Sequence, residues 1–140
     1  MSAAPRIEPI GHVESPLTER AMAPKQGTEG APDAWLVFVP EVLAGLEGLR
    51  AGDEAMVLTW LDRAHRDVLR VYPRDDRTKP QRGVFVTRSP DRPNPIGLHR
   101  VRVLEVDGAR VKVGDLEALD GTPILDVKGV MCRGRDRGGR

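Results

Sequence analysis

The segment of this sequence whose residue types are best suited to ligand binding or catalysis runs from Thr87 to Leu98. It reads T-R-S-P-D-R-P-N-P-I-G-L. Its three prolines restrict the residue before each of them to extended geometry, so a ligand would remove little conformational freedom on binding. Arg88 and Arg92 are expected to project from this stiff loop, and a guanidinium is a planar fork that suits a carboxylate or a phosphate. The segment predicts an anion-binding loop; a rigid structural connection with solvated arginines is the alternative.

A second segment with residues suited to ligand binding runs from Leu119 to Lys128 and reads L-D-G-T-P-I-L-D-V-K. Its Asp-Gly pair predicts a turn, and the Asp120 carboxylate could hold ribose hydroxyls or a cation. The strand that follows would carry Asp126 and Lys128 on one face, because alternate residues of a strand share a face. Asp-Gly turns are common in proteins, so a purely structural turn is the stronger reading of this segment on its own.

Other sites find little support. The short group Pro24-Lys25-Gln26 carries no specific signal by itself, and the three histidines, His12, His65 and His99, are too far apart to predict a metal site. Cys132 is the only cysteine, which excludes an internal disulfide and suits a reducing cytoplasm. The sequence contains neither a G-x-S-x-G elbow nor a G-x-G-x-x-G or Walker loop, so a Rossmann-type nucleotide site is not expected.

The elements that must position these residues are mostly short strands. Apolar and alternating runs predict strands at 7–13, 34–39, 54–61, 68–72, 83–87, 101–106, 111–116 and 124–130, with 34–39 buried on both faces and 68–72 paired with 54–61. Asp107-Gly108 between two of these runs predicts a hairpin. Pro40 opens a short helical pattern. Several short strands with one helix predict a mostly β chain, a small β-barrel or a sandwich.

Length and charge bound the rest. The 140 residues at 15.4 kDa predict one domain over residues 1–132, followed by a disordered arginine-rich tail at 133–140. The longest apolar run, Trp35–Val39, is far too short for a membrane helix, and the first residues do not resemble a secretory signal. Residues 62–100 hold ten Lys or Arg against five Asp. Such a basic stretch can attract phosphates, although a solvated surface of mixed charges is the simpler explanation.

Four of these segments together resemble the TsaA-like (YaeB-like) family of tRNA N6-methyltransferases, also called TrmO. The I-G-x-x-x-S-P start of the family is matched at 10–16, and its P-[KR]-Q element at 24–26. The run G-V-F-x-T-R-S-P-x-R-P-N-P-I-G is matched at 83–97, and L-D-G-T-P-x-x-D-x-K at 119–128. The likeness covers nearly all of residues 7–130.

This resemblance implies a methyltransferase that uses S-adenosylmethionine on a β-barrel unlike the Rossmann methyltransferases. Members act on N6 of threonylcarbamoyl-adenosine at position 37 of tRNA and are typically homodimers. Carried over by motif, the cofactor contacts would be Pro24, Lys25, Gln26, Leu61, Asp62, Arg88, Leu98, Leu119, Asp120, Gly121 and Thr122. The residues expected to contact the RNA substrate would be Arg92, Asn94 and Lys128.

The groups in these positions suit the chemistry. Arg88 or Arg92 could clamp the methionine carboxylate or an RNA phosphate, and Lys25 is a further candidate for the RNA backbone. Asp62 and Asp126 are the candidates to take the N6 proton. Where many relatives have an aromatic-His pair, this chain has Leu61-Asp62. That departure keeps two alternatives open: a methyltransferase of a small molecule, and a noncatalytic barrel that binds cofactor or RNA.

Overall fold

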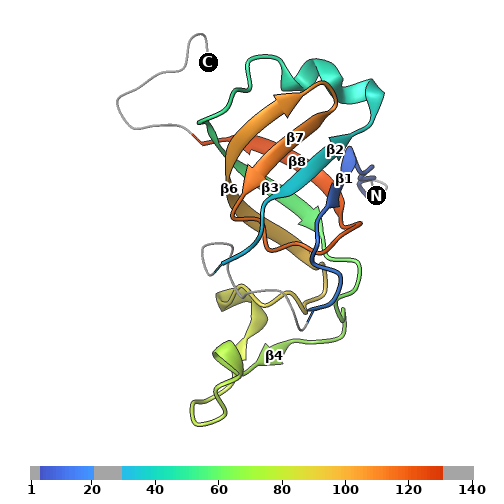
Figure 1. The fold of residues 1–140 in the computed structure, drawn as a ribbon. Helices are drawn as coiled ribbons and strands as arrows, with labels where there is room; N and C mark the ends of the chain where they lie inside the picture. The colour runs from blue at the N-terminus through green and yellow to red at the C-terminus, as the bar shows by residue number, and fades with distance from the viewer. Residues whose placement is uncertain (1–3, 21–29, 131–140) are drawn as a thin grey trace.

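The computed structural model describes residues 4–20 and 30–130. Six strands dominate these residues: β1 (Gly11–Glu14), β2 (Ala34–Phe38), β3 (Glu54–Trp60), β6 (Ile96–Asp107), β7 (Arg110–Gly114) and β8 (Pro123–Gly129). Each pairs antiparallel with two others in the order β1-β2-β7-β6-β3-β8, and β8 returns to β1, so the sheet closes on itself as a barrel (Figure 1). The chain is mostly β, as the sequence predicts.

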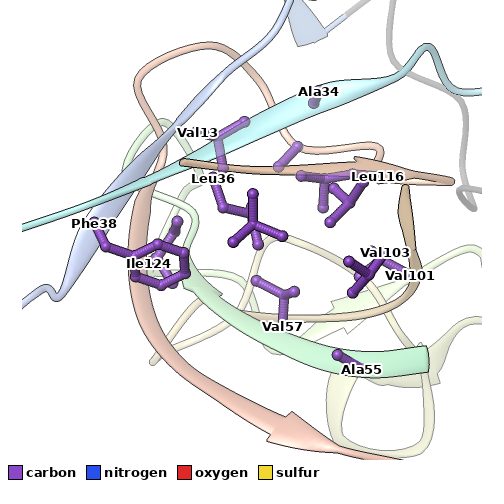
Figure 2. Packing of buried hydrophobic residues seen from close by; sticks show 13 residues of the cluster. Val13, Ala34, Leu36, Phe38, Ala55, Val57, Val101, Val103, Leu116 and Ile124 are labelled. Atoms are coloured by element: carbon purple, nitrogen blue, oxygen red, sulfur yellow. The ribbon is translucent and has the colours of Figure 1, made fainter. Parts of the chain in front are cut away.

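Alternation along the strands builds the interior. In β3 and β6 the buried residues are every second one, and this places one face of each strand inside and the other outside. Valine is the most frequent of the enclosed side chains, and β-branched residues pack well on a pleated surface. Figure 2 shows the cluster, with Val57, Leu36 and Ile124 pointing into the space between the strands. The core is apolar throughout most of its length.

The connections gather at the two ends of the barrel. The 3-10 helix η3 (Pro40–Leu46) lies at one end and packs Val42, Leu43 and Leu46 against the core cluster. At the opposite end, the residues between β3 and β6 form a lobe (Figure 1). The lobe contains the two-stranded sheet of β4 (Arg70–Val71) and β5 (Arg82–Gly83) and the 3-10 helices η4 (Pro73–Asp75) and η5 (Val84–Val86). The proline-rich loop at 87–98 and the turn at 119–122 both lie toward the lobe end, joined through residues 15–20.

The hairpin and the helical segment are confirmed. Asp107 pairs with Arg110 across the two-residue turn Gly108-Ala109, and Gly108 at its first position has a positive φ of 60°, which glycine adopts readily. The segment that begins at Pro40 is helical, although it forms a 3-10 rather than an α-helix. Gly45 lies within it, and glycine disfavours an α-helix interior.

Three expectations about strands were wrong. Residues 68–72 do not pair with β3; Arg70 and Val71 pair instead with β5 inside the lobe. Residues 83–87 are not one strand, because 84–86 form η5, in which Phe85 and Val86 are 78% and 65% exposed. β2 is fully buried on one face only; on its other face Trp35 is half-buried beneath the Arg110 guanidinium, 4.5 Å from the ring centre.

Candidate functional site

The proline-rich loop is held in shape by its own arginine. The Arg92 Nε donates to the Ser89 carbonyl at 2.9 Å, and Nη2 donates to the carbonyls of Thr87, at 2.7 Å, and Val84. A guanidinium carries several donors in a fixed plane, which lets one side chain bind carbonyls from both sides of a turn. The structure therefore gives Arg92 a role inside the loop, and the contact with RNA expected of it stays a prediction.

A second arginine ties this loop to the end of β3. The Arg66 Nε donates to the Pro93 carbonyl at 2.6 Å, and Nη2 donates to Asn94 Oδ1 at 2.9 Å. The same guanidinium lies over the Trp60 ring, 5.1 Å from its centre. The amide oxygen of Asn94, predicted to contact substrate, is thus engaged by Arg66, while its Nδ2 donors remain for a ligand.

The predicted Asp-Gly turn is present at residues 119–122, and side-chain hydrogen bonds hold it. Gly121 has a φ of 83°, a conformation that favours glycine. The Thr122 hydroxyl, which is buried, donates to the Leu119 carbonyl at 2.6 Å, and the Thr122 N–H donates to the same oxygen at 3.1 Å. The Asp120 Oδ1 accepts from the Ser15 N–H at 3.0 Å. Its Oδ2 lies on an exposed side chain and can accept from a ligand.

The hydroxyl of Thr122 should contribute measurably to stability. We expect Thr122→Val to lower the free energy of unfolding by about 1 kcal/mol, the usual value of one intramolecular hydrogen bond, because valine keeps the shape but loses the donor. Urea unfolding followed by fluorescence measures this change. Thr122→Ser retains the hydroxyl and loses the methyl group, so it measures the methyl contribution separately; wild-type stability in Thr122→Val would show that the hydrogen bond contributes nothing.

One short segment, residues 15–20, joins the turn to the lobe. The Leu17 carbonyl accepts from the Asp120 N–H at 2.7 Å, while the Thr18 carbonyl accepts from Arg63 Nη1 at 2.6 Å. Arg20 Nη2 then lies 3.1 Å from Asp91 Oδ2 in the proline-rich loop. These contacts bring the first and last thirds of the chain against its middle at one end of the barrel.

Asp91 is the acidic centre of this junction. Partial burial by itself raises the pKa of Asp91, but a hydrogen bond from the His65 N–H at 2.8 Å and the Arg20 guanidinium outweigh it and lower the pKa below its ordinary range. A lowered folded-state pKa means that the carboxylate stabilises the fold above the unfolded-state value. That stabilisation is lost as the pH falls through the folded-state value.

The pH dependence of stability tests this assignment. The wild-type chain should be more stable than Asp91→Asn at pH 7, and the difference should shrink as the pH is lowered below about 4, where an aspartate carboxyl begins to protonate. Urea unfolding of both proteins at neutral and acid pH measures the difference. A constant difference at every pH would contradict the role of the Asp91 charge.

The remaining predicted residues lie in three places. Pro24, Lys25 and Gln26 lie outside the described residues, as do Cys132 and the tail at 133–140. The Leu61 N–H donates a hydrogen bond to the carbonyl of the buried Pro95 at 2.8 Å. Asp62, the next residue, is exposed. Arg88 is exposed, and its guanidinium forms no ion pair or hydrogen bond with any residue in 4–20 or 30–130.

The other predicted residues lie on the outer face of the barrel. The register sets Leu58 opposite Leu98 on one side and opposite Asp126 on the other, so these three side chains form a row across β6, β3 and β8. Leu98 is 40% exposed, and Asp126 is exposed. Lys128 occupies the next row, opposite Met56. The described contacts do not join this row to the Asp120 turn, so the structure brings together only part of the predicted site.

Sequence reasoning missed the interactions that connect distant segments. The Arg20–Asp91 ion pair, the Arg66 fork and a buried pairing of Thr59 with His99 all join residues that are far apart in the chain, where no local pattern signals them. The described residues contain no group of three or more His, Cys, Asp or Glu side chains that could hold a metal ion. Within the same part of the chain, no helix has the length and apolar character needed to span a membrane.

Comparison with known proteins decides the family. The profile of the family described as the tRNA-methyltransferase O N-terminal domain matches residues 12–133. This chain belongs to the TrmO N-terminal domain family. The structure is also similar to a crystal structure of TrmO from Pseudomonas aeruginosa, with a TM-score of 0.72 and 26% sequence identity. That match covers 99% of this chain and 61% of the other, so this chain spans about three fifths of the crystallised protein.

Archaeal relatives of the TrmO-like chain are closer in sequence. A protein of Methanothermobacter thermautotrophicus, named a probable S-adenosyl-L-methionine-binding protein, is 46% identical over 123 residues, which cover 88% of each chain. An S-adenosyl-L-methionine-binding protein of Archaeoglobus fulgidus is 44% identical over 122 residues, or 87% of this chain and 86% of its own. The match therefore covers most of the length of these relatives.

Proposed function

We propose that this chain is a methyltransferase that uses S-adenosylmethionine to methylate N6 of threonylcarbamoyl-adenosine at position 37 of tRNA. The observation that carries the proposal is the convergence of three family segments at one end of the barrel: the 119–122 turn and the proline-rich loop are both bonded to residues 15–20. Family membership and the names of the archaeal relatives support the same cofactor.

The side chains of the proposed cofactor site suit the three parts of such a cofactor, with Leu98 on the outer face of β6 and the others near the lobe. An exposed guanidinium without a described ion pair, that of Arg88, suits the methionine carboxylate. The free oxygen of Asp120 suits ribose hydroxyls, and the exposed apolar surface of Leu98 suits the adenine ring. Pro24, Lys25, Gln26, Leu61, Asp62 and the rest of the 119–122 turn complete the proposed cofactor site. When bound, the cofactor supplies a methyl group on a sulfonium ion.

In this reaction the protein must align the accepting nitrogen with the methyl group and remove the N6 proton. Methyl transfer is an in-line displacement, so the chain must hold the accepting nitrogen behind the methyl group, and rigid loops favour this. The stiff proline-rich loop, locked by Arg92 and Arg66, meets that need. The N6 proton must leave after transfer, and the exposed carboxylates of Asp62 and Asp126 are the proposed acceptors.

The surface of the lobe suits an RNA substrate. The cations of the basic stretch that are exposed here are Arg63, Arg66, Arg70, Arg74, Arg77, Lys79, Arg82 and Arg88. Phosphate contacts from such side chains give binding that weakens steeply with salt. Arg92, Asn94 and Lys128 are the proposed substrate contacts in addition. We also expect the enzyme to act in the cytoplasm, where tRNA is found, and as a homodimer.

Transfer of labelled methyl groups tests the proposal. The purified chain is incubated with labelled S-adenosylmethionine and tRNA from its own organism, and in parallel with the same tRNA lacking the threonylcarbamoyl group. Label only on the modified tRNA is the expected result. Absence of label with the cofactor still bound would contradict the tRNA activity and favour a small-molecule acceptor or a noncatalytic binding protein.

A further inference from the structure

A chain of three polar side chains runs through the interior of the barrel near the proposed site. Thr59 on β3 and His99 on β6 are buried, 0% and 3% exposed. The Thr59 Oγ1 lies 2.7 Å from His99 Nε2, and His99 Nδ1 lies 2.6 Å from Glu117 Oε1. Glu117 is partly exposed, so the chain leads from the surface into the core.

The donors and acceptors of the three groups match. A carboxylate only accepts hydrogen bonds, so Nδ1 of His99 carries a hydrogen and donates a hydrogen bond to Glu117. Nε2 of the ring and the Thr59 hydroxyl can form their hydrogen bond in either direction, because a hydroxyl both donates and accepts. No buried side-chain nitrogen or oxygen within residues 4–20 and 30–130 lacks a hydrogen-bond partner. The chain is therefore complete in itself and gives the ring one fixed orientation.

The backbone makes room for this arrangement. Gly97 stands directly opposite Thr59 in the register of β3 and β6. A Cβ atom at Gly97 would lie 2.4 Å from Thr59 Oγ1 and 2.6 Å from His99 Nε2, both closer than real side chains approach. The glycine that ends the proline-rich loop thus has a packing reason: it leaves space for the Thr59–His99 pair.

Glu117 belongs to the segment that leads into the 119–122 turn. Residues 116–118 form no backbone–backbone hydrogen bonds with the described residues. Leu116 and Ala118 are buried, and apolar burial holds a segment without fixing its direction. The His99–Glu117 hydrogen bond is the directional contact that sets this segment against β6, and Leu119 follows two residues later.

Direct participation in chemistry does not fit the burial. The Thr59 hydroxyl is fully enclosed, so it has no access to a substrate as a nucleophile would need. The hydroxyl, imidazole and carboxylate lie between two strands and the turn, and this location suits a role in positioning the turn.

We propose that the Thr59–His99–Glu117 chain positions the 119–122 turn for cofactor binding by anchoring residues 116–118 to β6. The proposal rests on the proposed function in one respect, the assignment of the turn to the cofactor. A turn held in its binding geometry loses less freedom when the cofactor arrives, and affinity rises accordingly. Glu117 and His99 are thus positioning residues and do not touch the reacting atoms.

A matched pair of substitutions at Glu117 tests the proposal. Glu117→Leu removes the acceptor and should weaken S-adenosylmethionine binding by about tenfold in calorimetry, a shift of about 1.4 kcal/mol. Glu117→Gln keeps a carbonyl oxygen that can accept from His99 and should bind within about twofold of wild type. Val101→Ala, which opens a cavity in β6, controls for lost overall stability and should leave the affinity unchanged.

Hydrogen exchange in the cofactor-free protein gives a second, independent readout. The N–H groups of Asp120, Gly121 and Thr122 are hydrogen-bonded and should exchange faster in Glu117→Leu than in Val101→Ala. Unchanged exchange, or wild-type affinity in Glu117→Leu, would overturn the proposal. If the wild-type chain binds no S-adenosylmethionine, the proposed function fails, and the exchange rates alone decide whether Glu117 positions the turn.

Discussion

Replacing Arg92 by methionine should destabilise the protein by about 2–4 kcal/mol. The three carbonyls of Val84, Thr87 and Ser89 converge on this guanidinium. A hydrogen bond to a charged group contributes about 1.5–3 kcal/mol, and three on one side chain add up to less than their sum because they share one charge. Methionine keeps much of the apolar length and loses every donor, so the loop loses its internal anchor.

Urea unfolding measures the effect, with Arg92→Lys as the control. Lysine keeps the charge but has no planar fork, so it reaches fewer of the three carbonyls and should recover only part of the lost stability. If Arg92→Met unfolds at the same urea concentration as wild type, the loop is held by its prolines alone. Full recovery by lysine would show that charge matters and the fork does not.

Replacing Arg88 by alanine should weaken binding of S-adenosylmethionine at least about tenfold while leaving stability unchanged. Arg88 sits in the same loop as Arg92, but its guanidinium is exposed and forms no ion pair within the described ranges 4–20 and 30–130. Such a side chain contributes little to the fold and is available for an anionic ligand. Loss of a charge-assisted hydrogen bond costs about 1.5–3 kcal/mol, which corresponds to tenfold or more in affinity.

Calorimetry with the purified variants measures this change. Arg82→Ala removes the same charge from β5, elsewhere in the lobe, and is the matched control; cofactor affinity should stay the same in that variant. Equal weakening in both would indicate a diffuse effect of net charge. Unchanged affinity in Arg88→Ala would show that another group holds the cofactor carboxylate.

Local pattern predicted the strands that line the barrel because burial there alternates with the backbone. Val111 and Val113 face inward with Lys112 between them, and the Asp-Gly turn before them has the expected form. The same reasoning failed at residues 84–86, where Val-Phe-Val has the composition of a strand. In the lobe no neighbouring strand pairs with those residues, and their chain turns into η5 with Phe85 exposed.

The parts of the site that the sequence could not predict depend on contacts between distant segments. Arg92 and Asn94 were expected to face a substrate, yet Arg92 binds carbonyls near its own position and Asn94 accepts from Arg66, which lies 28 residues earlier in the chain. Nothing in the sequence signalled a buried partner for His99, and only the register of β3 and β6 places it beside Thr59. Identity of a residue suggests its chemistry, whereas three-dimensional proximity determines which partner it meets.

The pairing of β1 with β8 has a consequence for synthesis of the chain on the ribosome. Gly11 meets Ile124, so the first and last strands of the barrel are neighbours although nearly the whole sequence lies between them. The ring therefore has no complete form until the final strand has emerged, and contacts so distant in sequence form slowly. Until then the growing chain exposes the unpaired edges of β1 and β3, which are templates for aggregation until β8 emerges and pairs with both.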